Sequence, residues 1–326
     1  MNPDVSVLIV SFNTCETLRR CLQILRDTSH DVSYETIVID NASRDASAEM
    51  VAAEFPEVKL IRSPENLGFA AANNRGFEIA QGNYIALLNS DAFLSPKALR
   101  SALDYLQQHP RAALVGARLT GSQGEWQPSA RMIPTVWDHL FTLSGLAAKY
   151  PHSHVFGRID RTWANPDADA KVDWVPGAFS LIRRSVVDKI GLFDERFFLY
   201  YEEVDLCLRI QNAGYEIWYL PEIVVIHLGG ESSKTLTLEG GHSLSNSGAQ
   251  INLWQIRSAL LFHHKNFGKI SAWLWWQIEY RWHQVRAWKN RVKQPAKAAY
   301  SQHFCQLLRQ AWQDTQGGAI SPPRPW

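Results

Sequence analysis

The sequence predicts an α/β fold in which a doubly wound, mostly parallel sheet with flanking helices precedes a C-terminal helical extension. Two observations lead to this prediction. Apolar, β-branched runs without polar alternation, typical of strands buried on both faces, alternate with segments of helical period. From residue 252 onward, the 326-residue chain instead becomes rich in tryptophan and in basic residues.

The first part of the chain supplies the strands and helices in regular alternation. Strands are expected at residues 5–12, 34–41, 58–63, 83–91 and 112–119, and helices at residues 14–25, 43–55, 68–80 and 95–109. In such sheets, ligands bind outside the carboxyl ends of the strands. The polar residues that end these strands are therefore candidate site residues: Asn13, Asp40, Asn41, Asn89 and Asp91.

Regular structure is interrupted and then returns. Residues 121–170 are predicted to form loops around a short helix near 135–148, followed by the apolar segment "VDWVPGAFSLIRR" and a helix that ends at residue 213. Two helices are expected within residues 252–293, and a looser end beyond Gln294. We expect a catalytic domain over residues 1–250 and a helical extension over residues 251–326.

Composition excludes several classes of protein. The net charge of +1 gives no reason to expect a nucleic-acid partner, and four scattered cysteines without a C-x-x-C pair indicate neither a disulfide framework nor a zinc site. The first residues, "MNPDVSVLIV", lack the features of a signal peptide, so a cytoplasmic location is expected. The apolar run "SAWLWWQI" is far shorter than the roughly 18 residues that cross a membrane.

The charge is nevertheless unevenly distributed. Residues 252–326 hold eleven basic and two acidic residues, a net charge of +9, which leaves −8 for residues 1–251; eight of the thirteen tryptophans also lie there. Trp275, Ile278, Trp282, Val285 and Trp288 recur at helical spacing. Such a basic, aromatic helix suits the anionic inner face of a membrane, to which we expect peripheral association. The alternative is a tail that packs on its own catalytic domain.

Several motifs carry candidate chemistry. Asp91, beside Asn89 and Ser90, is suited to bind Mg²⁺ or Mn²⁺ as well as to cap a helix. Asp40 and Asn41 suit either a nucleotide or a turn, and Gly68 and Arg75 either an anion at a helix start or ordinary packing. The chain has no G-x-G-x-x-G and no P-loop.

Three carboxylates in "FFLYYEEVDLCLR" pose a sharper question, because they follow buried aromatic residues. A helix start explains one of them, Asp205, since acids favour that position. Glu202 or Glu203 can then supply a general base. His227 is followed by two glycines, which makes it a plausible further metal ligand as well as a structural histidine.

The ordered motifs "VLIVSFN", "IVIDNASRD", "NLGFAAANNRG", "LLNSDA", "VPGAFSLIRR", "FLYYEEVDLCLR" and "IHLGGES" closely resemble family 2 glycosyltransferases, over about residues 4–233. The chain looks most like their bacterial rhamnosyltransferase-like branch. This resemblance implies a GT-A fold with a nucleotide-sugar half at about residues 1–120 and an acceptor half at about residues 121–250. It also implies an inverting, metal-dependent enzyme that extends a bacterial surface glycan on a polyprenyl-diphosphate-linked acceptor.

By position, the resemblance gives Glu203 the role of the base, with Glu202 as the alternative, because the family's Glu-Asp pair is Glu-Glu here. It gives Asp91 and His227 to the metal. The donor would be bound by Ser11, Asn13, Asp40, Asn41, Asn66, Gly68, Arg75, Asn89, Ser90, Trp174 and Gly177. Expected partners are a dTDP- or UDP-sugar, with L-rhamnose as the candidate sugar, a lipid-linked glycan and a second copy in a homodimer.

Two other functions fit parts of the sequence. A nucleotidyltransferase that makes a nucleotide sugar usually carries a glycine-rich loop after its first strand, which "SFNTCETLRR" lacks. A non-catalytic scaffold at the membrane surface would have no need of Asp91, Glu203 and His227.

Overall fold

The computed structural model describes residues 2–229 and 245–322. By packing, the chain divides into two compact units. The sheet unit comprises the described residues of Met1–Ile133, Ala164–Asp194 and Glu202–Thr235, and the helical unit those of Pro134–Trp163, Glu195–Tyr201 and Leu236–Trp326. Packing thus groups two segments before residue 250 with the C-terminal helices. The functional boundary expected at residue 250 stays a prediction.

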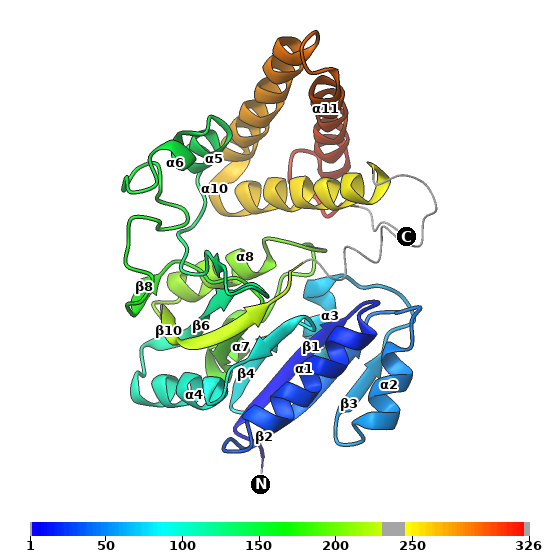
Figure 1. Cartoon of the computed structure of the whole chain (residues 1–326), viewed down its shortest axis with the longest axis vertical. Coiled ribbons are helices and arrows are strands. Elements are labelled where there is room, and N and C mark those ends of the chain that lie inside the picture. Colours follow the sequence, from blue (N-terminus) through cyan, green and yellow to red (C-terminus); the bar gives the residue numbers. More distant parts are fainter. Residues whose placement is uncertain (1, 230–244, 323–326) are drawn as a thin grey trace. The chain divides into compact units, whose positions relative to one another are not determined.

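The sheet unit is built on one mixed sheet (Figure 1). Its strands, in chain order, are β1 (Val5–Ser11), β2 (Tyr34–Asp40), β3 (Lys59–Arg62), β4 (Tyr84–Leu88), β5 (Ala92–Leu94), β6 (Ala112–Thr120), β7 (Trp126–Gln127), β8 (Ala170–Val172), β9 (Phe179–Arg183) and β10 (Glu216–His227). Across the sheet they run β3-β2-β1-β4-β9-β6-β10-β5, with β7 on β6 and β8 on β10. Strands β1 to β4 pair in parallel, whereas β9 is antiparallel to both β4 and β6.

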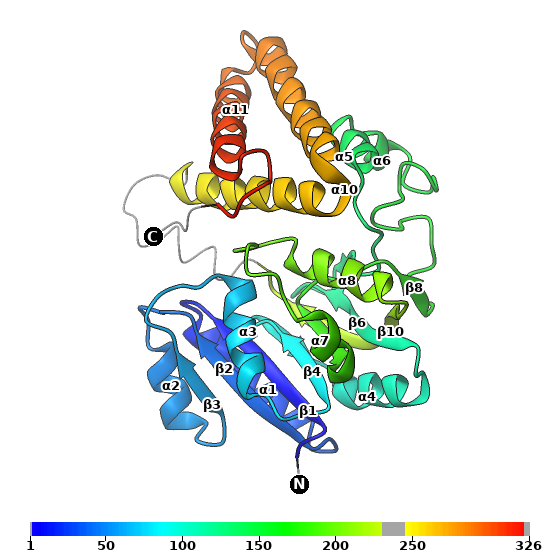
Figure 2. The same ribbon diagram turned by 180° about the vertical axis from the view of Figure 1, so that it is seen from behind.

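Helices cover both faces of this sheet. They are α1 (Cys15–Thr28), α2 (Ser47–Glu54), α3 (Phe69–Ile79), α4 (Ala98–Gln108), α7 (Arg184–Ile190) and α8 (Glu202–Asn212). Figure 1 shows α1 in front of the sheet, and Figure 2 shows α3 and α7 on the opposite face. The predicted doubly wound, mostly parallel sheet with flanking helices is confirmed.

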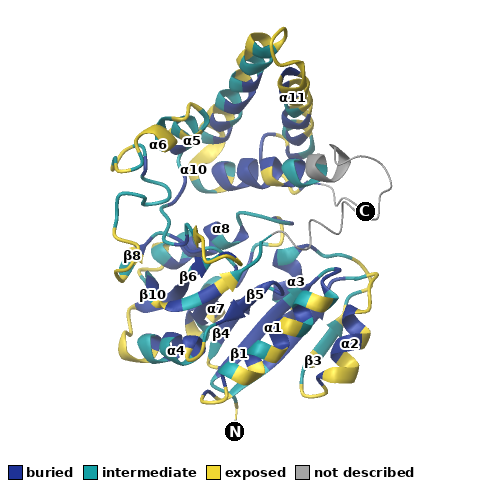
Figure 3. Cartoon of the chain, in the orientation of Figure 1, coloured by how far each residue is buried: buried dark blue, intermediate teal, exposed yellow. Residues whose placement is uncertain are grey.

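The burial of the strands explains why the alternation of strands and helices could be predicted from the sequence. Every residue of β1 is buried except Val10, and β4 is buried from Ile85 onward. Figure 3 shows these central strands in the colour of buried residues, whereas β3 at the edge of the sheet is more exposed. A Cβ at Gly76 of α3 would lie 2.7 Å from Ile39 Cδ1 of β2, so a larger residue here would require that methyl group to shift. The helix therefore packs closely against the sheet.

The helical unit contains α5 (Val136–Leu143), α6 (Leu146–Lys149), α10 (Ser245–Asn290) and α11 (Pro295–Thr315). The short helix expected near 135–148 is confirmed as α5 and α6. Gly268, with φ 83°, breaks α10 into two helical segments. The looser end expected beyond Gln294 is wrong, because α11 is a helix of 21 residues. Ala298, Ser301, Cys305, Leu308 and Ala311 bury one side of it, a stripe of mostly small residues that the polar composition concealed.

Aromatic and ionic contacts hold this unit together. Trp276 stacks on Tyr280 with ring centroids 4.8 Å apart and donates from Nε1 to the carbonyl of Leu308 at 2.8 Å, which joins α10 to α11. On the other side, His139 of α5 is paired with the carboxylate of Glu279. Burial alone would raise the pKa of Glu279, but its hydrogen bonds with His139 and His283 lower it to about 2. Of the predicted stripe, Trp275 is buried in packing, whereas Val285 and Trp288 are exposed.

Within the described residues, none of the helices is both long enough and apolar enough to span a membrane.

Candidate functional site

The carboxyl ends of β1, β2 and β4 lie side by side in the sheet unit. Ser11 at the end of β1 is in register with Asp40 at the end of β2, and the loop that follows β4 begins at Asn89. A run of hydroxyls crosses from one loop to the other: Ser11 Oγ lies 3.0 Å from Thr14 Oγ1, which donates to Ser90 Oγ at 3.1 Å. The parallel register therefore brings three predicted donor-binding positions, Ser11, Asp40 and Ser90, to one edge of the sheet.

Asp40 has an oxygen that its own chain does not use. Its side chain is buried, with 5% exposure. Oδ2 accepts from the backbone N–H of Ser43 at 3.3 Å, whereas Oδ1 is buried without a hydrogen-bond partner. Burial raises the pKa of this carboxyl above its usual value, while the contacts with Ser43 act in the opposite direction. A buried acceptor without a partner is costly, and a ligand N–H or O–H would satisfy it.

Three predicted asparagines are already engaged within the chain. Asn13, at φ 54°, accepts from the N–H of Arg44 at 2.7 Å. Asn41 donates to Asn66 Oδ1 at 2.9 Å and accepts from the N–H of Leu67 at 2.9 Å. These bonds fix the loops after β1, β2 and β3. Gly68, at φ 81°, then opens α3. Contacts of these residues with a donor stay predictions.

Asp91 and His227 meet because β5 pairs antiparallel with the end of β10, in the register His227 to Ala92. His227 Nε2 lies 3.6 Å from Asp91 Oδ1. The ring is held from its other side by Gln127 of β7, whose Oε1 lies 3.1 Å from Nδ1 and whose Nε2 donates to the carbonyl of His227 at 3.0 Å. With an N–H at Nδ1 donating to this amide oxygen, Nε2 keeps a free lone pair toward Asp91.

Asp91 and His227 are suited to act as two ligands of one divalent cation. An imidazole nitrogen and a carboxylate oxygen suit Mn²⁺, and the separation of 3.6 Å allows one ion to contact both. Asn89 Oδ1, two residues from Asp91, is buried without a hydrogen-bond partner. In the described part of the chain, however, no group of three or more His, Cys, Asp or Glu side chains is arranged to hold a metal. Asp91 and His227 would thus supply only two of the ligands that a divalent cation needs.

Glu202 and Glu203 open α8, directly after two residues with positive φ, Tyr200 and Tyr201. Both carboxyl groups have a buried Oε2 without a hydrogen-bond partner. Burial, together with the neighbouring charge of Glu203, raises the pKa of Glu202 well above its usual value. Burial also raises the pKa of Glu203, against its own backbone hydrogen bond and the charge of Arg131. The two adjacent carboxyls thus have different surroundings, because Arg131 acts on Glu203.

Arg131 and Trp174 form the wall on this side. The guanidinium of Arg131 lies 4.6 Å from the ring centroid of Trp174, and their backbones form an isolated bridge. Trp174 is buried, and its Nε1 donates to the carbonyl of Met132 at 2.9 Å. Gln211 of α8 donates to Asp173 Oδ1 at 3.2 Å. This bond connects the segment that contains Trp174 to the helix that carries the glutamates.

Two other predicted positions have different surroundings. Gly177 lies in the loop before β9, next to Ala178, whose carbonyl accepts from the N–H of Asn89 at 3.0 Å. Arg75 lies on α3 with most of its side chain exposed and 3.8 Å from Glu78. The structure thus gives Arg75 a surface partner on its own helix, and its contact with a donor stays a prediction.

Sequence reasoning missed three residues of this site: Thr14, Gln127 and Arg131. Gln127 and Arg131 lie in the segment 121–170, where no periodicity indicated which polar side chains point inward. Thr14 directly follows the first strand, and nothing in the sequence distinguished its hydroxyl group from the polar groups of its neighbours.

Known proteins match this chain in sequence and in fold. The sequence model described as glycosyl transferase family 2 matches residues 6–191. The N-acetylglucosaminyl-diphospho-decaprenol L-rhamnosyltransferase of Mycobacterium tuberculosis is 27% identical over 303 residues, 86% of this chain and 89% of that protein. The rhamnosyltransferase WbbL of Escherichia coli K12 is 26% identical over 286 residues, 82% of this chain and 98% of that protein.

A solved structure shares the fold at low sequence identity. The mannosyltransferase PcManGT of Pyrobaculum calidifontis, in complex with GDP-Man and Mn²⁺, superposes with a TM-score of 0.51 at 16% identity, and the match covers 97% of this chain and 76% of that one. This likeness supports the GT-A fold.

Replacing Glu202 by glutamine is expected to stabilise the protein, and more so at pH 8 than at pH 5. Folding raises the pKa of the Glu202 carboxyl above its value of about 4.3 in the unfolded chain. Its contribution to the stability of the native state is therefore fully present below the unfolded pKa and is lost as the pH rises through the folded pKa. Glutamine does not titrate, so Glu202→Gln removes this loss. Thermal melts at both pH values measure the effect, with Glu222→Gln, an exposed carboxyl of β10, as the control. An equal shift in melting temperature at the two pH values would contradict the raised pKa of Glu202.

Proposed function

Because the chain belongs to glycosyl transferase family 2 and is a glycosyltransferase, we propose that it transfers a sugar, L-rhamnose as the first candidate, to a lipid-linked glycan. The donor would be a dTDP- or UDP-sugar, and the acceptor a hydroxyl of a growing bacterial surface glycan on a polyprenyl diphosphate. The two rhamnosyltransferase relatives, each matched over most of its length, support this choice of substrates. The observation that carries the mechanism is the unequal environment of Glu202 and Glu203.

In this mechanism, Glu203 is the general base. Its carboxylate takes the proton of the acceptor hydroxyl, and the oxygen attacks the anomeric carbon of the donor sugar. The bond from that carbon to the diphosphate oxygen breaks on the opposite face, so the configuration is inverted. Burial raises the pKa of Glu203 toward the range useful to a base, and its backbone hydrogen bond and the charge of Arg131 oppose that shift. Two carboxyls whose environments push their pKa values apart are a recurrent arrangement in catalysis.

The donor is positioned by the edge of the sheet. Asp40 Oδ1 is free to accept an N–H of the nucleotide base, and the start of α3 at Gly68 offers backbone N–H groups to an anion. Ser11, Asn13, Ser90 and Gly177 would line the remaining contacts, with Trp174 on the side of Glu203. The assignment of the base to uracil or thymine is part of the proposal.

Asp91 and His227 would hold Mg²⁺ or Mn²⁺, with substrate oxygens completing the coordination. When bound, such a cation stabilises the negative charge that develops on the leaving diphosphate. The Mn²⁺ of the mannosyltransferase complex belongs to that protein and supports the proposal through the shared fold alone. Gln127 orients the imidazole so that Nε2 faces Asp91.

Replacing Asp91 by alanine should abolish transfer while the fold stays intact, because the substitution removes the charged ligand. EDTA should likewise inhibit the wild-type protein, and added Mg²⁺ or Mn²⁺ should restore activity. Product formation from a radiolabelled donor measures both effects. Asp27→Ala, an exposed carboxyl on α1, is the control and should keep full activity. Full activity in EDTA without added cation would exclude the metal role.

Replacing Glu203 by glutamine keeps the shape of the side chain but removes the base, so kcat should fall by about 10²–10⁴ with little change in donor binding. Single-turnover transfer and donor titration separate the two quantities. Glu202→Gln is the matched variant and should lose far less activity. If Glu202→Gln is inactive and Glu203→Gln is near normal, the assignment is wrong by one residue.

We further propose that the protein works at the cytoplasmic face of the membrane through its C-terminal helices. Val285, Trp288 and Val292 are exposed near the end of α10, and Lys289, Arg291, Lys293 and Lys297 lie among them or just beyond. Exposed apolar residues amid basic ones suit a surface of anionic headgroups. A homodimer stays a prediction.

Charge reversal at Arg281, Arg286 and Lys289 should reduce both binding to anionic liposomes and transfer to a lipid-linked acceptor. Each basic residue near an anionic surface contributes about 1 kcal/mol, so three reversals should weaken binding at least a hundredfold at low salt. Donor hydrolysis should stay nearly unchanged. Reversal at Arg62, Lys97 and Arg111, which are exposed residues of the sheet unit, is the matched control. A wild-type protein that does not sediment with anionic liposomes at low salt would contradict membrane binding.

A further inference from the structure

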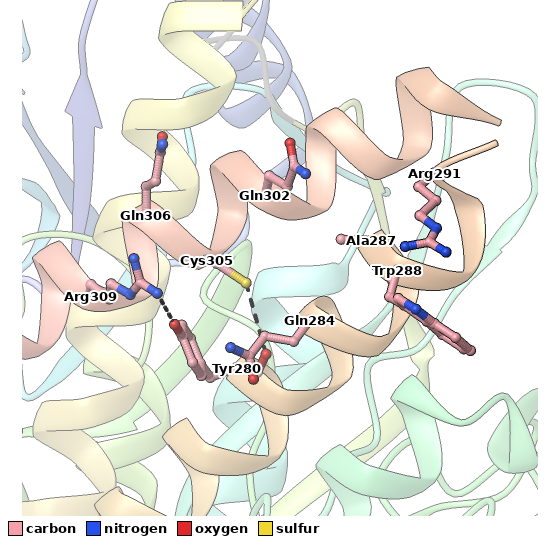
Figure 4. Close-up of a pocket in the computed structure, with 9 residues that line it drawn as sticks. All are labelled: Tyr280, Gln284, Ala287, Trp288, Arg291, Gln302, Cys305, Gln306 and Arg309. Atoms are coloured by element: carbon pink, nitrogen blue, oxygen red, sulfur yellow. Dashed lines mark hydrogen bonds between the residues drawn. The ribbon is translucent and has the colours of Figure 1, made fainter.

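A groove of about 550 Å³ runs between α10 and α11 (Figure 4). It lies wholly within the helical unit. Its walls come from residues 280–291 on one side and residues 302–309 on the other. We call it the α10–α11 groove. None of the positions proposed for the donor, the base or the metal contributes to it.

The groove is positively charged. Arg291 and Arg309 both line it, and its lining, all of which lies in the described part of the chain, includes no carboxylate. Arg309 donates from Nη2 to the hydroxyl of Tyr280, which holds its guanidinium in place and leaves further N–H groups available. The guanidinium of Arg291 lies 5.9 Å from the ring centroid of Trp288. Arginine is well suited to bind phosphate or carboxylate through paired N–H groups.

The two arginines lie at opposite ends of the groove (Figure 4). Arg309 donates a hydrogen bond to Tyr280 at one end of the groove. Arg291 lies eleven residues after Tyr280 in the sequence. At a rise of 1.5 Å per residue, this separation is about 16 Å along the helix. A ligand that reaches both guanidiniums is therefore elongated and carries more than one anionic group.

Amide side chains lie along the groove, and Trp288 lies beside Arg291 at one end (Figure 4). Gln284, Gln302 and Gln306 offer donors and acceptors that match hydroxyl groups. The indole of Trp288, with 67% of its surface exposed, presents a flat apolar face. No leucine, isoleucine, valine or phenylalanine is among the described lining residues, so the groove is poorly suited to an acyl chain.

From these features we infer that the α10–α11 groove binds an anionic oligosaccharide, a chain of sugars that carries carboxylate or phosphate groups. The hydroxyls would bond to the three glutamines, a sugar face would stack on Trp288, and the anionic groups would pair with Arg291 and Arg309. The inference rests on the proposed function to the extent that an enzyme extending a glycan meets such a chain. A phospholipid headgroup is the competing occupant.

The test is a titration of the full-length protein with a tetramer of galacturonic acid, followed by calorimetry. Maltotetraose, which is uncharged, and vesicles of phosphatidylglycerol are run in parallel. The acidic tetramer should bind, and maltotetraose should bind at least tenfold more weakly. Arg291→Gln and Arg309→Gln should each weaken binding of the tetramer about tenfold or more. Lys97→Gln and Lys269→Gln remove the same charge from exposed positions outside the groove and should change it less than threefold.

Further variants keep the test decisive. Arg309→Gln also breaks the bond to Tyr280, so thermal melts accompany each variant, and Arg309→Lys should regain part of the affinity. Gln302→Ala and Gln306→Ala together should weaken binding without a change of charge. Equal losses in the lysine controls, equal binding of maltotetraose, or groove-dependent binding of vesicles alone would overturn the inference. Donor hydrolysis, measured on the same samples, reports on the proposed function separately.

Discussion

The antiparallel pairing of β5 with the end of β10 is the contact on which the candidate site depends. It joins residue 92 to residue 227 across more than a hundred residues of chain. Without this pairing, Asp91 would be an acidic residue in a surface turn and His227 the last residue of a strand. With it, the two side chains face each other and Gln127 can hold the imidazole from behind. The pairing of a short strand thus brings the candidate ligand pair together.

A second constraint is the burial of two adjacent carboxyl groups. Two neighbouring negative charges in a dry environment repel each other, and only one can be kept at low cost. Burial raises the pKa of both groups, and at Glu203 its backbone hydrogen bond and the charge of Arg131 oppose the shift. The arginine is itself placed by its bridge to Trp174 and by the ring beneath it. The loop after β7 therefore contributes a charge that distinguishes the two glutamates.

The helical unit follows other rules. Its interior mixes aromatic rings with ionic groups, and the pair between His139 and Glu279 links α5 to α10. Trp275 and Trp276 pack inside this unit. Trp288 remains exposed, beside basic residues. One helix thus serves first as a packing element and then, toward its end, as a surface for binding.

The sequence by itself determined the alternation of strands and helices. Runs of apolar, β-branched residues without polar alternation are typical of strands that are buried on both faces of a sheet, so the strands could be recognised. It also determined the family, since ordered motifs at strand ends identify it, and this answers the alternatives of a nucleotidyltransferase and a scaffold. Asp40, Asp91 and His227 could be singled out because strand ends are recognisable. Only the tertiary structure placed β9 and β5 antiparallel in the sheet and brought Gln127 and Arg131 to the site. It also revealed α11, whose buried stripe is mostly of small residues that composition does not register as a core. The physical reason is that these features rest on contacts between distant segments, and local propensity carries no information about partners that lie a hundred residues away.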